Sequence, residues 1–441
     1  MTSGTPRSRA SCTIVVSSRI ALVTAEPYLR TAVERGVDVW LCAPRALLSS
    51  ASDRFPLSED RLLDLEAIAT TRRRLKKLHS AMILMLASPK LTRSHLLLND
   101  PRSVATNRTG RLLRRVAKHT ARLHPRQFNR LATTVLRLFH RNPFPTDVVI
   151  AVSFCSEPHL LTGRGMKIST IVESWDHPMK KPAGYTTDTV VGWNDDISGD
   201  WAELQGARRS VVGYPIKLAY AFTGASSMIE ERTSNRRRAM YAVGTSSNSD
   251  RSDHYRGELD VIEQVCIATQ LANWELLIKP KPNGRTGDFD EFEDRYPHVT
   301  IGTYRDAPTA LDYDLDDEYN KIRRDELESC DLVINCWTTF GLDAAAAGVP
   351  VLQLDLREFA RWPAIARGSG NYHLANYLVG LEHAFRPDPA RALAESLAVE
   401  LGDPFPRAKR FTGAARSWVT PEAPIDSLID DALDTILDRA D

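Results

Sequence analysis

Short apolar runs alternate with amphipathic stretches along most of this sequence. Near its start, the β-branched run 13–17 precedes helix-like apolar spacing over 19–36 and a second apolar run over 37–44. A strand, a helix and a strand within about 30 residues form a βαβ unit, which requires a parallel sheet. The pattern predicts further strands at 147–153, 168–174 and 187–194.

A second series of the same kind begins after Pro215. Its predicted strands are 239–243, 274–280, 298–304, 331–336 and 350–356. Helical spacing separates them at 257–272, 289–296, 317–330 and 341–348. Two such series, each starting its own sheet, indicate an α/β protein with two doubly wound, Rossmann-like domains.

The predicted domain boundary lies near 211–222, where the first series ends. We therefore expect a first domain over 1–215 and a second over 216–387. The remaining segment, 388–441, has helical spacing, and its last helix, about 425–438, is expected to pack back on the first domain.

Composition excludes several classes of protein. The chain has 441 residues with a formal net charge of +1, so its overall charge does not point to nucleic acid. It holds no run of about 18 apolar residues, and its start lacks the apolar core of a signal peptide. The six cysteines form no CxxC pair, which favours reduced thiols and a cytoplasmic protein.

One segment departs from this charge balance. Residues 71–141 contain 18 lysines and arginines against one acidic residue, Asp100, and apolar residues are interleaved with them. Amphipathic basic helices of this kind are attracted to anionic membrane surfaces by about 1 kcal/mol per basic residue. The alternative is a set of solvated peripheral helices inserted in the first domain. Nucleic acid is the rival partner, but no known binding motif supports it.

The segment TTFGLD, 338–343, lies between two apolar runs, at the predicted end of one strand and the start of a helix. Ligands of doubly wound folds bind there, because the first helical turn leaves N–H groups unpaired. Thr338 and Thr339 can cap the helix or donate hydroxyls, Gly341 lets a ligand approach the backbone, and Asp343 can accept from a sugar hydroxyl. The alternative is that the threonines are only caps and Asp343 only a helix-dipole partner.

The stretch TTFGLDAAAAGVPVL resembles the S-T-x-x-x-E-A…G-x-P-V segment of GT-B glycosyltransferases. The nearest branch includes CDP-glycerol glycerophosphotransferases and surface-polysaccharide transferases, and UDP-N-acetylglucosamine 2-epimerases share the pattern. Four further segments carry the resemblance: LLIKPKPN, VVGYP, MYAVGTSS (240–247) and the stretch from Val172 to Asn194. The resemblance implies two Rossmann-like domains that face each other across a cleft, with the nucleotide-linked donor bound by the second.

The same resemblance implies a set of donor-binding residues. These are Gly244, Thr245, Ser246, Lys279, Lys281, Thr338, Thr339, Gly341 and Asp343. Two positions depart from the family pattern. Lys281 stands where histidine is usual, which keeps a positive charge but removes a neutral acid or base. Asp343 stands where glutamate is usual and has a shorter reach, so the donor need not be a standard UDP-sugar.

The stretch WDHPMKK supplies the candidates for catalysis. Transfer from a nucleotide donor with inversion needs a general base on the acceptor hydroxyl. Asp176 is the first candidate because it takes the position that matches the family, and His177 is the second. The alternative is a turn in which Asp176 caps local N–H groups. The acidic stretch 312–318 lacks the spacing of a calcium loop, so we expect no metal and no cofactor apart from the donor itself.

These observations predict a glycosyltransferase, or a glycerol-phosphate-type transferase, in surface-polysaccharide assembly. It would move a group from a nucleotide-activated donor to a glycan or lipid-linked acceptor, and act in the cytoplasm or at the inner face of the membrane. Two alternatives remain open. One is a 2-epimerase-like enzyme, and the other is a non-catalytic, membrane-peripheral protein with a degenerate transferase fold.

Overall fold

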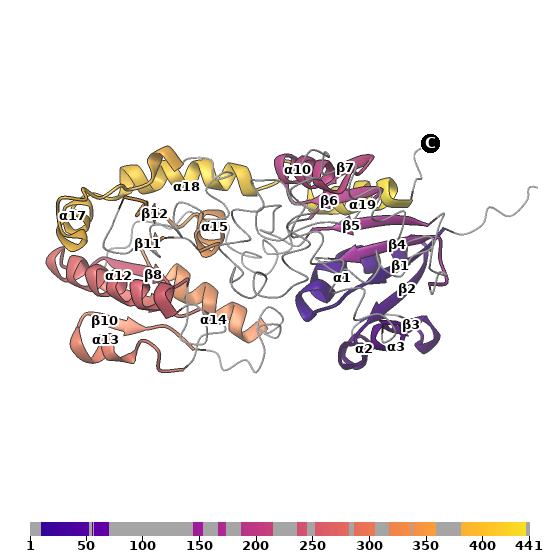
Figure 1. Ribbon diagram of the computed structural model, residues 1–441, viewed down its shortest axis with the longest axis horizontal. Coiled ribbons are helices and arrows are strands. Elements are labelled where there is room, and N and C mark those ends of the chain that lie inside the picture. Colours follow the sequence, from indigo (N-terminus) through magenta and orange to yellow (C-terminus); the bar gives the residue numbers. More distant parts are fainter. Residues whose placement is uncertain are drawn as a thin grey trace, which may run out of the picture. The chain divides into compact units, whose positions relative to one another are not determined.

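The computed structural model of the 441-residue chain divides into two compact units (Figure 1). Unit 1 comprises Met1–Ile216 and Pro421–Asp441, and unit 2 comprises Lys217–Thr420. The residues that the structure describes are 10–52, 55, 57–69, 144–152, 166–172, 187–214, 236–244, 252–281, 286–304, 317–336, 338–358 and 381–437. The predicted basic segment 71–141 lies outside them.

Unit 1 is built on a seven-stranded parallel sheet with the order β3-β2-β1-β4-β5-β6-β7. The strands are β1 Ser11–Val15, β2 Asp38–Ala43, β3 Leu62–Asp64, β4 Val148–Val152, β5 Lys167–Ile171, β6 Thr189–Gly192 and β7 Arg209–Val212. Its helices are α1 Arg19–Glu34, α2 Arg45–Ser52, α3 Leu65–Ala69, α10 Asp195–Gln205 and α19 Ile425–Leu437, with a 3₁₀ turn, η1, at Glu59–Arg61. The direction of the strand order reverses between β1 and β4, as in a doubly wound fold.

Local signals explain where the helices of unit 1 begin and end. Ser18 caps α1 by accepting the Ala21 N–H at 3.2 Å, and Asn194 caps α10 by accepting the Ile197 N–H at 2.8 Å. Gly206 ends α10 with a φ of +63°, a conformation that glycine adopts without strain.

The last helix, α19, belongs to unit 1 although it follows unit 2 in the sequence. It packs on α1, β6 and β7 through a buried face that includes Leu428, Leu433 and Ile436. Arg35, directly after α1, forms ion pairs with Asp430 and Asp434, which lie one helical turn apart on α19. The helices of segment 388–441 therefore divide between the units, since α17 and α18 precede residue 421.

Unit 2 has a five-stranded parallel sheet with the order β10-β9-β8-β11-β12. The strands are β8 Arg238–Ala242, β9 Glu275–Lys279, β10 Val299–Ile301, β11 Leu332–Asn335 and β12 Val351–Gln353. The helices are α12 Ser252–Leu271, α13 Asp290–Arg295, α14 Asp317–Glu328, α15 Phe340–Ala346, α17 Leu393–Glu400 and α18 Phe405–Val419, with a 3₁₀ turn, η4, at Leu381–His383.

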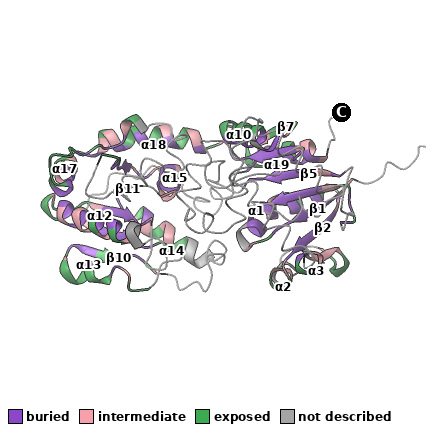
Figure 2. Ribbon diagram, viewed as in Figure 1, coloured by how far each residue is buried: buried purple, intermediate pink, exposed green. Residues whose placement is uncertain are grey.

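The core of unit 2 lies on both faces of its sheet. Figure 2 shows the strands almost wholly buried and the helices buried along one side only. Helix α17 packs against α12, and α18 packs against α15 and β12. Strands buried on both faces explain the nearly continuous apolar runs of the sequence, such as 332–334 and 276–278.

The predicted fold class is confirmed: two doubly wound parallel α/β sheets. Two strands were missed, β3 (Leu62–Asp64) and β7 (Arg209–Val212), and β7 falls where the sequence suggested the domain boundary. Both are short edge strands whose residues are only half-buried or exposed, so they lack the apolar signal of the central strands. Five cysteines are buried free thiols: Cys12, Cys42, Cys266, Cys330 and Cys336. No helix within the described ranges combines the length and the apolarity needed to cross a bilayer.

Candidate functional site

The chain order of unit 2 creates a switch point between β8 and β11. From β8 the sheet grows through β9 to β10 on one side, and the chain then returns to add β11 and β12 on the other side. The loops after β8 and β11 therefore leave neighbouring strand ends in opposite directions, which opens the sheet edge where doubly wound folds bind ligands. The loop after β8 contains Gly244, and the loop after β11 contains Thr338.

A row of residues ends four neighbouring strands at this edge. The parallel register aligns Lys279 of β9 with Ala242 of β8, Ala242 with Asn335 of β11, and Asn335 with Gln353 of β12. Residues aligned in a parallel register point to the same face of the sheet. Three of the four are polar, and all four are buried. The strands β9, β11 and β12 thus each end in a polar residue, and these residues are aligned across the sheet.

Asn335 and Gln353 join the ends of β11 and β12 and shape the loop between β11 and α15. The Asn335 Nδ2 donates to the Gln353 Oε1 at 2.7 Å and to the Thr338 carbonyl at 3.1 Å. The Thr338 hydroxyl donates to the Asn335 Oδ1 at 2.6 Å, and the Gln353 Nε2 donates to the Cys336 carbonyl at 2.6 Å. Sequence analysis missed both amides. Their signal is a polar residue at the last position of an otherwise apolar strand.

Gly341 is required by this network. A Cβ built on Gly341 would lie 2.6 Å from the Asn335 Nδ2, closer than real contacts allow. The glycine therefore admits the Asn335 amide, whereas the sequence suggested that it admits a ligand. Thr339 stands at the N-cap of α15 but makes no side-chain capping bond.

Asp343 is buried in α15 and forms an ion pair with Arg323 of α14. The guanidinium carbon of Arg323 also lies 5.2 Å from the ring centroid of Phe340, the first residue of α15. The carboxylate predicted to meet a ligand hydroxyl thus has an internal cationic partner. Sequence analysis did not single out Arg323, although its spacing from Glu326 places both on one face of α14.

Lys279 is also held by α14. Its side chain is 4% exposed and forms an ion pair with Glu326, and its Nζ donates to the Thr303 carbonyl at 3.4 Å. Burial lowers the pKa of the Lys279 ammonium, and the Arg323 charge acts in the same direction, while Glu326 opposes both. Glu326 also accepts the Thr303 N–H at 2.6 Å. Lys281, two residues beyond, is exposed.

The start of the loop after β8 is held by a hydrogen bond to a buried glutamate. The Gly244 N–H donates to the Glu258 Oε1 at 2.7 Å, and the Tyr241 hydroxyl contacts the same oxygen at 3.3 Å. Glu258 is buried in α12. The N–H of Gly244, a predicted donor-binding residue, is therefore bonded within the protein.

Four predicted site residues lie outside the described part of the chain. They are Thr245, Ser246, Asp176 and His177. Their roles, like the predicted ligand contacts of all the other donor-site residues, stay predictions. Among the described residues there is no group of three or more His, Cys, Asp or Glu side chains arranged to hold a metal ion.

Gly341→Ala should lower the free energy of unfolding by about 1–3 kcal/mol, because the new methyl group displaces the hydrogen-bonded Asn335 amide. Gly413→Ala is the matched control, since Gly413 also lies in a helix and a Cβ there meets nothing within 4 Å. It should be neutral or stabilise by up to about 1 kcal/mol. Urea unfolding followed by circular dichroism measures both. Equal stabilities for the two variants would contradict the close approach of Asn335.

Lys279→Met should cost about 3–5 kcal/mol, because it leaves the carboxylate of Glu326 without its buried partner. The double variant Lys279→Met with Glu326→Leu should recover most of this loss. Lys281→Met is the control at an exposed position and should leave the melting temperature unchanged. Thermal unfolding by calorimetry tests the set. If Lys279→Met melts like the wild type, Lys279 is not a structural partner of Glu326.

No known family model and no curated protein matches this chain. Solved structures do resemble it along nearly its whole length. A UDP-N-acetylglucosamine 2-epimerase from Listeria monocytogenes matches with 12% identity over 99% of this chain and 98% of its own, at a TM-score of 0.48. A glycosyltransferase from Rickettsia africae matches with 11% identity over 98% and 100%, at 0.45, and MurG from Acinetobacter baumannii with 9% identity over 96% and 99%, at 0.43. Similarity at this level assigns no activity to this chain.

Proposed function

We propose that this protein is a nucleotide-donor transferase, a glycosyltransferase or glycerol-phosphate-type transferase that acts in surface-polysaccharide assembly. One observation carries the proposal. Of the sequence segments that resemble donor-site motifs, 240–247 begins within β8 and 338–343 follows β11, and these are the strands on either side of the switch point. That is where the physics of a doubly wound sheet favours a nucleotide.

The charges at this sheet edge suit a donor that carries both phosphates and hydroxyls. Arg323 supplies a planar set of donors for a diphosphate, and Asp343 supplies an acceptor for sugar or glycerol hydroxyls. Because the two residues pair with each other, a donor diphosphate would compete with Asp343 for Arg323. The released carboxylate then accepts from a hydroxyl of the same donor. Lys281, exposed after β9, adds a positive charge for the leaving phosphate.

The acceptor side of the reaction rests on the first domain. Asp176, with His177 as the second candidate, takes the proton of the acceptor hydroxyl as the donor bond breaks. The basic segment 71–141 holds the enzyme at an anionic membrane surface, where a glycan or lipid-linked acceptor is found.

A screen of nucleotides tests the donor site directly. One of UDP, GDP and CDP should raise the melting temperature by about 5 °C at roughly one hundred times its dissociation constant. The shift arises because the nucleotide binds the folded protein and not the unfolded chain. Differential scanning fluorimetry measures it, with inorganic phosphate as the control. Tight binding to anionic vesicles with no shift from any nucleotide would favour the non-catalytic alternative.

The base is assigned by a pair of variants. Asp176→Asn should retain donor binding and lower turnover by at least about a hundredfold, the usual scale for one general base. If histidine is the base, His177→Ala has this effect instead, since only the base must accept the proton. Turnover is measured as nucleotide release with a saturating acceptor. Unchanged turnover in both variants would remove WDHPMKK from the mechanism.

A further inference from the structure

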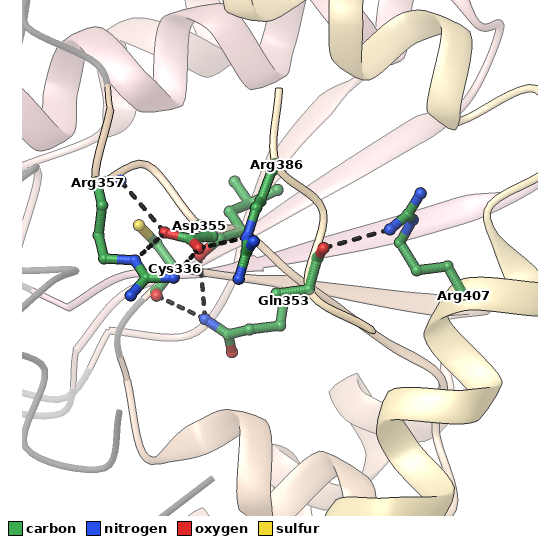
Figure 3. Close-up of polar contacts among 8 residues, drawn as sticks. Cys336, Gln353, Asp355, Arg357, Arg386 and Arg407 are labelled. Carbon is green, nitrogen blue, oxygen red and sulfur yellow. Dashed lines mark hydrogen bonds and ion pairs between the residues drawn. The ribbon is translucent and has the colours of Figure 1, made fainter. Parts of the chain in front are cut away.

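Asp355 holds two arginines just beyond the end of β12 (Figure 3). Arg357 donates to the Oδ1 from Nε at 2.8 Å and to the Oδ2 from Nη2 at 2.5 Å. Arg386 donates to the Oδ2 from Nε at 2.9 Å. The carboxylate is almost fully enclosed, whereas the Arg357 and Arg386 side chains are 40% and 60% exposed. Two exposed guanidinium groups are thus fixed on one buried anion.

The backbone on both sides of this cluster is fixed by the sheet. Leu354 and Phe385 form a parallel bridge that continues β12. The Asp355 N–H donates to the Phe385 carbonyl at 2.9 Å, and the Phe385 N–H donates to the Gln353 carbonyl at 2.7 Å. Arg407 of α18 braces the same strand by donating to the Ala384 carbonyl at 3.3 Å. Arg386 directly follows this bridge, so its position is set by sheet hydrogen bonds.

The charges of the cluster are unbalanced. Although burial raises the pKa of the Asp355 carboxyl, the hydrogen bonds from Arg357 and Arg386 hold it below its usual value, so Asp355 remains an anion at neutral pH. Glu358 offsets part of the Arg357 charge. Arg386 bonds to the described residues only through Nε, so within that part of the chain its two terminal amino groups have no acceptor.

A contrasting cluster shows what a purely structural arginine looks like in this protein. Arg35 stands between two carboxylates, Asp430 and Asp434, and its charge is more than neutralised. At Asp355 the ratio is reversed, with two arginines on one carboxylate. One arginine is enough to neutralise the Asp355 carboxylate beyond β12. The charge of the second arginine is free to attract an anionic ligand.

We propose that Arg386 and Arg357, positioned by Asp355, form a binding site for an oxyanion, a phosphate or a carboxylate group. The planar guanidinium fork matches the oxygens of either group, and charge-assisted bonds of this kind are strong. The site lies one strand beyond the switch point, at the carboxyl edge where doubly wound sheets bind ligands. It is distinct from the donor residues proposed above, which follow β8, β9 and β11.

Titration calorimetry with pyrophosphate at low ionic strength tests the site in the full-length protein. Arg386→Gln should weaken pyrophosphate binding at least about tenfold, the effect of losing one charge-assisted contact. Arg386→Lys should recover only part of this affinity, because lysine keeps the charge and loses the fork. Arg391→Gln is the matched control, because Arg391 is 63% exposed and pairs loosely with Asp388 at 3.8 Å. All three variants should melt within about 2 °C of the wild type, as surface substitutions do.

Parallel titrations with UDP, GDP and CDP identify the source of the oxyanion. If Arg386→Gln weakens both pyrophosphate and a nucleotide, the site receives the donor diphosphate. If it weakens pyrophosphate alone, the site receives a second anionic group, and this result stands even if no nucleotide binds and the proposed function fails. Wild-type protein that binds no pyrophosphate, an Arg386→Gln affinity within twofold of wild type, or an equal loss in Arg391→Gln would overturn the proposal.

Discussion

The buried amide of Asn335 is the interaction on which the edge of the second sheet depends. It ties the end of β11 to β12 through Gln353, and it holds the loop before α15 through Thr338. Asn335 and Gln353 are buried, so losing one partner would leave a polar atom unsatisfied at a cost of about 1–3 kcal/mol. The network also dictates glycine at position 341. The backbone geometry of segment 338–343 is thus set by hydrogen bonds and close packing against Asn335.

Helix α14 supplies the charges that complete this edge. Arg323 and Glu326, one turn apart, pair with Asp343 of α15 and Lys279 of β9. Each buried ion therefore has a partner, as the cost of an unpaired charge in a low dielectric requires. A ligand that binds Arg323 or Lys279 must displace the carboxylate paired with it. The affinity of the ligand therefore depends on how much more strongly it binds than that carboxylate. Such an edge favours ligands with strong, localised charge over neutral sugars.

The order of the central strands and helices was predictable because these strands bury both faces and leave nearly continuous apolar runs. The short edge strands β3 and β7 are not buried in this way, and both were missed. The position of segment 338–343 between β11 and α15 could also be predicted, since T-T-x-x-x-D comes shortly after an apolar strand. The internal partners of Asp343 and Lys279 could not be predicted, because α14 is separate in the sequence from the elements that carry them. Only the tertiary fold brings Arg323 and Glu326 to these residues. Lys279 shows the difference clearly: its motif suggested a ligand contact, and its burial beside Glu326 gives it a structural partner.

Polar residues after the strands of unit 2 divide into two kinds by their charge balance. Lys279 pairs with Glu326, and Arg323 pairs with Asp343, so the two charges of each pair offset each other. Asp355 has two arginines, both with exposed side chains, and Arg386 uses a single nitrogen on it. A fold stabilised only by packing has no reason to keep an exposed guanidinium fixed, because ordering a long side chain costs conformational entropy. The excess charge beyond β12 is therefore better explained by an anion that binds there than by the stability of the sheet.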